Sequence, residues 1–205
     1  MLLSLLSRAA AGLSTAHPGV YDVVQALLGA KHSRRRLAPW LAAAGGKRVL
    51  DVGAGTGLPR ALLPDTAAYV WLDPDRNKLR GYRARYADGG VIVGDGGALP
   101  LKDRSVDLGL CVAVSHHLPD GPLDALFAEL DRVVRERVVF LDAVLCPTAP
   151  IGRLLWRWDA GSHPRPAEVL LRAMERRLEI EHVEQYRVYH RYLLCVARPR
   201  RRGDP

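Results

Sequence analysis

Residues 49–57 read Val-Leu-Asp-Val-Gly-Ala-Gly-Thr-Gly, an apolar run that ends in three alternating glycines. The run predicts a buried strand, and the glycines predict a turn at which a ligand can approach the backbone closely. Helical spacing at residues 58–63 predicts a helix whose first N–H groups point into the same space. This stretch therefore predicts the first strand, the binding loop and the first helix of an α/β sheet.

The spacing of the glycines restricts the ligand of this loop. A phosphate-binding Walker loop needs Gly-Lys followed by Ser or Thr, and no lysine follows these glycines. A dinucleotide loop reads GxGxxG, whereas Gly53, Gly55 and Gly57 are spaced GxGxG. Asp51, just before the loop, would repel a pyrophosphate and would suit a ligand that carries an ammonium group and a sulfonium.

Segments with strand and helix patterns alternate after this point. Strands are predicted at residues 47–52, 69–72, 90–93, 106–114 and 137–144, with helical spacing at 58–63, 75–86 and 122–135 between them. Such alternation predicts right-handed βαβ units and a mostly parallel sheet. A helix at about 166–177 and two last strands at 178–188 and 191–197 complete the pattern.

The ends of the chain and one internal segment depart from this alternation. Residues 1–46 are predicted to form an N-terminal helical cap, in which residues 1–14 form an amphipathic helix that docks on the core or on a membrane surface. Residues 47–198 form the sheet domain, with a Pro- and Trp-rich insertion at 147–166. Residues 199–205 are a basic tail.

Length and composition limit the class of protein. The 205 residues suit one domain, and the net charge of +8 allows a nucleic-acid or anionic membrane partner. Because the arginines gather at 34–36 and 198–202, we favour a solvated helix end and a frayed terminus, with no nucleic-acid partner. The three cysteines, Cys111, Cys146 and Cys195, form no CxxC and indicate buried thiols. We expect a cytoplasmic protein, peripheral to a membrane if residues 1–14 dock there.

Five motifs in order make the chain resemble the class I S-adenosylmethionine-dependent methyltransferases, and within them the ubiquinone/menaquinone-type (type 11) subgroup. They are the glycine stretch, Asp73 in YVWLDPD, GDGGALP at 94–100, Asp107 with HHLPD at 116–120, and ExxRVV at 129–134. The resemblance covers about residues 47–145. The turn before the fifth strand departs from the family's Lys-Pro-Gly-Gly, since Arg135-Glu136 stands there.

This resemblance implies a fold and a cofactor. The fold is α/β: a Rossmann-like, doubly wound, seven-stranded and mostly parallel sheet with one antiparallel C-terminal strand and helices on both faces. The cofactor is S-adenosyl-L-methionine, with Asp73 on the ribose hydroxyls and Asp95 on the adenine amino group. The residues expected to bind it are Tyr21, Asp51, Gly53, Ala54, Gly55, Gly57, Asp73, Pro74, Asp95, Gly96 and Val112.

Six of these residues have a structural alternative. The glycines could form an ordinary strand-to-helix turn, Asp73 a helix N-cap and Asp95 a turn before Gly96. Tyr21 could serve helix packing alone.

Chemistry and acceptor binding are assigned to the segments after the fourth and fifth strands. His116 and His117 are candidate bases, because His is the side chain suited to proton transfer near neutral pH, although a structural pair is an equal alternative. Trp156, Trp158, His163 and Arg165 are candidate substrate residues, with a capping loop around core tryptophans as the alternative.

The sequence thus predicts transfer of a methyl group to oxygen or nitrogen of a small-molecule acceptor, such as a lipid, quinone or secondary metabolite, by in-line displacement. Methylation of RNA or protein, and a non-catalytic cofactor-binding partner subunit, are the alternatives. We expect no metal, and a monomer or homodimer.

Overall fold

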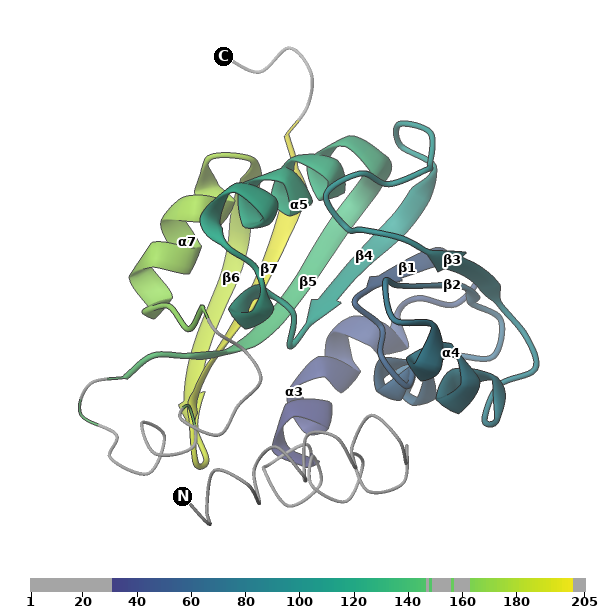
Figure 1. Cartoon of the computed structure of the whole chain (residues 1–205), viewed down its shortest axis with the longest axis horizontal. Helices are drawn as coiled ribbons and strands as arrows, with labels where there is room; N and C mark the ends of the chain where they lie inside the picture. The colour runs from purple at the N-terminus through teal and green to yellow at the C-terminus, as the bar shows by residue number, and fades with distance from the viewer. Residues whose placement is uncertain (1–30, 147, 149–155, 157–162, 201–205) are drawn as a thin grey trace.

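The computed structural model describes residues 31–146, 148, 156 and 163–200. Within these ranges one seven-stranded sheet forms, in the order β3-β2-β1-β4-β5-β7-β6 (Figure 1). The predicted cap is therefore described only from residue 31 onward, and the predictions for Tyr21 and Trp158 fall outside the described residues.

The strands confirm the predicted sheet. β1, β2, β3, β4 and β5 pair in parallel, and β7 is antiparallel to both of its neighbours, β5 and β6. The C-terminal strand is thus the antiparallel one. Their bounds are β1 Arg48–Val52, β2 Ala68–Asp73, β3 Gly90–Val93, β4 Val106–Val112, β5 Val134–Val144, β6 Leu178–Arg187 and β7 Arg191–Pro199.

Four α-helices of the described ranges cover the sheet: α3 Lys31–Ala42, α4 Arg76–Arg83, α5 Asp120–Val133 and α7 Ala167–Glu175. The α-helix predicted at 58–63 is wrong in type, since residues Leu58–Leu62 form the 3₁₀ helix η2. Its bonds run over three residues, from Arg60 N to Gly57 O and from Leu63 N to Arg60 O. Pro59 supplies no N–H at the start of this turn, and 3₁₀ geometry is the usual form of such short pieces.

Two apolar clusters occupy the two faces of the sheet. Along β1, Leu50 and Val52 belong to the cluster under α5 and α7, whereas Val49 belongs to the cluster under α3 and α4. This alternation is the period of two that a strand imposes on its side chains. Helices on both faces, as predicted, leave the ends of the strands as the accessible edges.

The fourth strand ends earlier than predicted. The strand pattern at 106–114 suggested continuous pairing, but β4 stops at Val112 because Ala113 adopts a left-handed backbone with φ 58°. Its N–H donates to the Leu141 carbonyl at 2.8 Å, and the 3₁₀ helix η3, Ser115–His117, follows. The chain thereby turns off the sheet at its carboxyl edge, and places the two histidines there.

None of the helices in the described ranges has the length and apolar character needed to cross a membrane.

All three cysteines are free thiols and buried, as their apolar surroundings predicted.

Candidate active site

The loop after β1 has a backbone that explains its glycines. Gly53, Gly55 and Gly57 have φ angles of 67°, 55° and 76°, a region that side chains other than glycine rarely adopt. The loop is tied to β2, since Ala54 N donates to the Leu72 carbonyl at 3.0 Å.

The three glycines face different surroundings. A Cβ added to Gly53 would overlap the Val114 side chain, and one added to Gly57 would lie 2.6 Å from Tyr82 Cδ2. A Cβ added to Gly55 would lie 4.0 Å from the nearest atoms described. Close packing therefore accounts for the outer two glycines, and Gly55 is where the loop presents open backbone.

Asp51 lies below this loop and is 1% exposed. Its Oδ2 accepts a hydrogen bond of 2.5 Å from the Tyr69 hydroxyl. Burial raises the pKa of Asp51 to about 7; the Tyr69 bond lowers it and the nearby charge of Asp73 raises it further. Because this pKa lies near neutral pH, a cation bound close to Asp51 would shift the carboxyl group to its ionised form.

Asp73, at the end of β2, holds the glycine loop. Its Oδ2 accepts from Gly55 N and its Oδ1 from Asp75 N, both at 2.9 Å, and Lys78 Nζ lies 3.6 Å from Oδ2. The opposite side of the loop is held by Trp71, whose Nε1 donates to the Gly55 carbonyl at 2.8 Å. Asp75, not Asp73, is the N-cap of α4, so the N-cap alternative for Asp73 is wrong.

The loop after β3 carries the third carboxylate. Asp95 is exposed, and its Oδ1 accepts from Gly97 N at 2.8 Å, as a turn acid does. A Cβ on Gly96 would lie 2.7 Å from Val52 Cγ1, so this glycine lets the loop pack on β1. Pro74 is exposed, and Val112 is half-buried at the end of β4.

The fifth motif, at 129–134, braces this loop. Glu129 Oε2 accepts from Leu99 N at 2.6 Å, and Arg132 Nη2 donates to the Leu99 carbonyl at 2.9 Å. Arg132 also pairs with Glu129, at 2.7 Å from Nε to Oε1. These residues of α5 therefore fix the position of the loop that carries Asp95.

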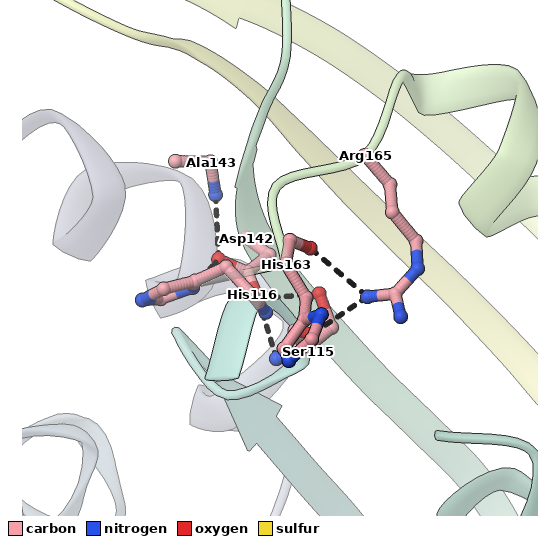
Figure 2. A network of polar contacts seen from close by, with 6 residues as sticks. All are labelled: Ser115, His116, Asp142, Ala143, His163 and Arg165. Atoms are coloured by element: carbon pink, nitrogen blue, oxygen red, sulfur yellow. Dashed lines mark hydrogen bonds and ion pairs between the residues drawn. The ribbon is translucent and has the colours of Figure 1, made fainter. Parts of the chain in front are cut away.

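The contact between Gly53 and Val114 joins the glycine loop to η3. Ser115 and His116 are buried there, and both bind Asp142 of β5 (Figure 2). Asp142 Oδ2 accepts from Ser115 N at 2.7 Å and from Ser115 Oγ at 2.6 Å. Its Oδ1 lies 2.7 Å from His116 Nδ1 and accepts from Ala143 N at 2.7 Å.

The electrostatics of this pair follow from its partners. Burial by itself would raise the pKa of Asp142, but the charge of His116 and the hydrogen bonds from His116, Ser115 and Ala143 outweigh it. The pKa of Asp142 is therefore held below its ordinary value, and the carboxylate is ionised at neutral pH.

Arg165 directs its guanidinium at the protein. Its Nε and Nη2 donate to Asp120 Oδ1 at 2.9 and 2.6 Å, and Nη2 also donates to the Leu118 carbonyl at 2.7 Å. Nη1 donates to the carbonyls of Ser115 and His163, each at 3.0 Å (Figure 2). Arg165 thus ties the first residue of η3 and the chain that follows η3 to the segment before α7.

The other predicted acceptor residues gather around His116. His163 N donates to the His116 carbonyl at 2.9 Å. The ring centroids of His117 and Trp156 lie 4.1 and 5.6 Å from that of His116, and Trp156 lies 4.8 Å from His190. The described residues of the insertion, Trp156 and His163, therefore lie beside the pair of His116 and His117.

The sequence predictions missed Ser115, Asp142, Tyr69, Trp71 and His190. One signal was available for Asp142: an acid within the apolar run of residues 137–144 must be paired if it is buried. Within the described ranges, no three His, Cys, Asp or Glu side chains gather as metal ligands would.

The fold is that of the Rossmann-like class I methyltransferases. Residues 50–141 match the family model described as "Methyltransferase domain", type 11. This confirms the resemblance seen in the motifs.

Among its curated relatives, an "Uncharacterized methyltransferase" of Mycobacterium ulcerans is 38% identical over 103 residues, 47% of this chain and 40% of the relative. The "Fatty-acid O-methyltransferase" of Mycolicibacterium smegmatis is 30% identical over 148 residues, 65% of this chain and 52% of the relative. The chain thus spans roughly a third to a half of the length of the curated relatives it matches.

Among solved structures, the geranyl diphosphate C-methyltransferase of Streptomyces coelicolor, in complex with Mg²⁺, geranyl diphosphate and S-adenosyl-L-homocysteine, superposes with a TM-score of 0.66. It is 14% identical, and the match covers 82% of this chain and 80% of that one. At this identity the likeness supports the fold.

Proposed function

We propose that this protein transfers the methyl group of S-adenosyl-L-methionine to oxygen or nitrogen of a small-molecule acceptor. One observation carries the proposal: the glycine loop, with Asp51 and Asp73 against it, touches through Val114 the segment that bears His116. A cofactor site and a candidate base therefore lie next to each other on the carboxyl edge of the sheet, where open α/β sheets bind their ligands.

The donor set suits this cofactor. S-adenosylmethionine carries a positive sulfonium, an ammonium group and a ribose diol. Of the three carboxyl groups on adjacent strands, Asp51 is the penultimate residue of β1, Asp73 ends β2 and Asp95 follows β3. A pyrophosphate would be repelled by the same set. Open backbone at Gly55 leaves room for the ligand to approach. We propose Ala54, Pro74, Gly96, Val112, Tyr21 and the neighbouring glycines as further residues that contact the cofactor.

The chain contributes mainly by positioning. The bound cofactor supplies an activated methyl group, so the carbon–sulfur bond can break as the bond to the acceptor forms. The glycine loop and the carboxylates fix one reactant, and the segment around His116 fixes the other in line with it. Alignment of this kind can supply about 7–11 kcal/mol of the barrier.

The acceptor side is apolar and aromatic, with several imidazoles. Trp156 lies beside His116 and His190, and we propose that Trp156, Trp158 and His163 border a lipid-like, quinone or secondary-metabolite acceptor. The fatty-acid O-methyltransferase among the relatives agrees with an amphiphilic acceptor. Cytoplasmic location, peripheral membrane contact through residues 1–14 and a monomer or homodimer stay predictions.

Calorimetric titration with S-adenosylmethionine tests the cofactor site. Gly55→Asp places a carboxylate and a strained backbone in the open part of the loop, and Asp73→Ala removes the group that holds it. We expect at least a tenfold loss of affinity in both. Gly121→Asp is the matched control, because a side chain at this exposed glycine at the start of α5 meets no described atom within 4 Å. Unchanged affinity in both loop variants would remove the site assignment.

Methyl-labelled cofactor and an extract of the protein's own host then identify the acceptor class. We expect the label in small molecules soluble in organic solvent. Label in RNA or protein would favour the alternative methyltransferases, and cofactor binding without any label transfer would favour a non-catalytic partner subunit.

A further inference from the structure

We propose that Asp142 is a positioning residue that keeps a proton on Nδ1 of His116, so that Nε2 of His116 is the base for an acceptor that must lose a proton. The inference rests on the proposed methyl transfer. It selects one histidine of the pair and one class of acceptor, a neutral hydroxyl such as that of an alcohol or phenol.

The geometry distinguishes the two oxygens of Asp142. Oδ2 is taken by Ser115, which donates from both its backbone N–H and its hydroxyl. Oδ1 faces Nδ1 of His116 at 2.7 Å and is held in place by Ala143 N at 2.7 Å. A carboxylate fixed by donors on both oxygens cannot rotate away, so it specifies the orientation of the imidazole.

An ionised carboxylate also specifies the tautomer. Carboxylate oxygens accept hydrogen bonds and do not donate them, so the neutral imidazole must carry its hydrogen on Nδ1. Nε2, on the other side of the ring, then holds the lone pair that takes a proton. After the transfer, the negative charge of Asp142 stabilises the imidazolium.

The backbone of η3 is restrained from the opposite side. Arg165 donates to the Ser115 and Leu118 carbonyls, and His163 N donates to the His116 carbonyl. Among the described residues, the charged and titratable groups near His116 include Asp142 from β5, His117 on η3 itself, and Arg165 with His163 from the segment before α7. Asp142 bears the negative charge among them, and it contacts the ring directly.

The proton balance defines the acceptor. As the acceptor oxygen bonds to the methyl carbon and the carbon–sulfur bond breaks, the hydroxyl proton passes to Nε2 of His116. Water takes it up later, and the products are a methyl ether and S-adenosylhomocysteine. An ionised carboxylate acceptor has no such proton to lose, and the pair of His116 and Asp142 would serve no purpose for it.

Long-range ¹H–¹⁵N correlation spectra of the histidine rings, recorded from pH 5 to 9, test the positioning role without any substrate. The His116 signals are assigned by their loss in His116→Gln. We expect the neutral ring of the wild-type protein to carry its proton on Nδ1. In Asp142→Asn the amide can donate to Nδ1, so the proton should move to Nε2 and the pKa of His116 should fall. Ser115→Ala, which leaves Oδ1 intact, should keep the wild-type tautomer.

If the neutral His116 ring of the wild-type protein carries its proton on Nε2, the proposed role of Asp142 is wrong. This measurement uses the wild-type protein alone, so it does not depend on whether Asp142→Asn folds. The same tautomer and titration in the folded Asn variant would overturn this role equally.

Alkaline hydrolysis of the labelled product tests the acceptor class. Methyl ethers keep their label, whereas methyl esters release it as volatile methanol. We expect alkali-stable label, and a drop in its rate of formation of about 10²–10⁴-fold in Asp142→Asn with cofactor affinity unchanged. Label released as methanol would overturn the hydroxyl acceptor. Failure of S-adenosylmethionine to bind would instead refute the proposed function and leave the tautomer result standing.

Discussion

At the scale of single residues, the sequence singled out three aspartates as candidate cofactor residues but did not predict their hydrogen-bond partners. Asp51 was expected to face a cationic ligand because it precedes the glycines. In the structure it is buried against Tyr69, a residue 18 positions away on the neighbouring strand. The pairing of β1 with β2 sets this contact, and register between strands cannot be read from one strand's sequence.

The raised pKa of Asp51 makes stability depend on pH. In the unfolded chain this carboxyl ionises near its ordinary pKa of 3.8, whereas in the folded protein it keeps its proton until about pH 7. The folded state therefore binds more protons between these values, and the free energy of unfolding falls as pH rises from about 4 to 7, by up to about 4 kcal/mol from this group.

Asp51→Asn should remove this dependence, since the amide oxygen can still accept from Tyr69 and carries no charge. Urea unfolding at pH 5 and pH 8 measures it: the variant should gain stability over the wild-type protein at pH 8 and little at pH 5. Parallel pH profiles for the two proteins would show that Asp51 ionises normally in the fold.

Arg165 provides a second test at the scale of single residues. It distinguishes a role in acceptor binding from a structural role in holding the backbone near η3. Its guanidinium reaches Asp120 and three backbone carbonyls, and a lysine can replace few of these bonds. Arg165→Lys should lower the free energy of unfolding by about 2 kcal/mol through buried carbonyls left without donors. Urea unfolding and the KM for the acceptor separate the roles: unchanged stability with a raised KM would indicate direct contact with the acceptor.

At the scale of elements, the sequence pattern predicted the strands but not the residues at which they end. Apolar periodicity placed β4 correctly but extended it through residue 114, because Ala113 and Val114 continue the pattern. The left-handed backbone at Ala113 ends the strand and starts η3. An alanine gives no sign of such a conformation, whereas the glycines of the first loop do. Strain of this kind is often kept where a side chain must be aimed.

Ala113→Val tests this turn. A β-branched side chain is disfavoured in the left-handed region, so the variant should be less stable than the wild-type protein by about 1–2 kcal/mol. Ala113→Gly, which adopts this backbone without strain, is the matched control and should change stability little. Thermal or urea unfolding gives both values. Equal stability of the Val and Gly variants would mean that the turn relaxes at no cost.

At the scale of the whole molecule, the order of motifs predicted which strand ends share one edge of the sheet better than any single residue did. The carboxyl ends of parallel strands meet at one edge, so residues far apart in the sequence, such as Asp73 and His116, were expected there together. The sheet order and the antiparallel last strand agree with that expectation. Trp156 and Arg165 were also predicted as substrate residues. The way in which the insertion contacts η3 could not be predicted, because it depends on contacts between residues some 50 positions apart, which the spacing of residues in the sequence does not encode.

We predict that one half of this edge binds the cofactor and that the other half carries out the transfer, and this prediction can be tested in the whole protein. Asp73 lies at the end of β2 and His116 beyond the end of β4, with β1 between these strands. Asp73→Ala should therefore weaken cofactor affinity, whereas the double variant His116→Ala/His117→Ala should lower turnover by about 10²-fold or more and leave affinity near the wild-type value. Calorimetry with S-adenosylmethionine and label transfer to the acceptor measure the two quantities separately. Full turnover in the double variant would show that both histidines only support the fold, and the methyl transfer would then depend on alignment alone.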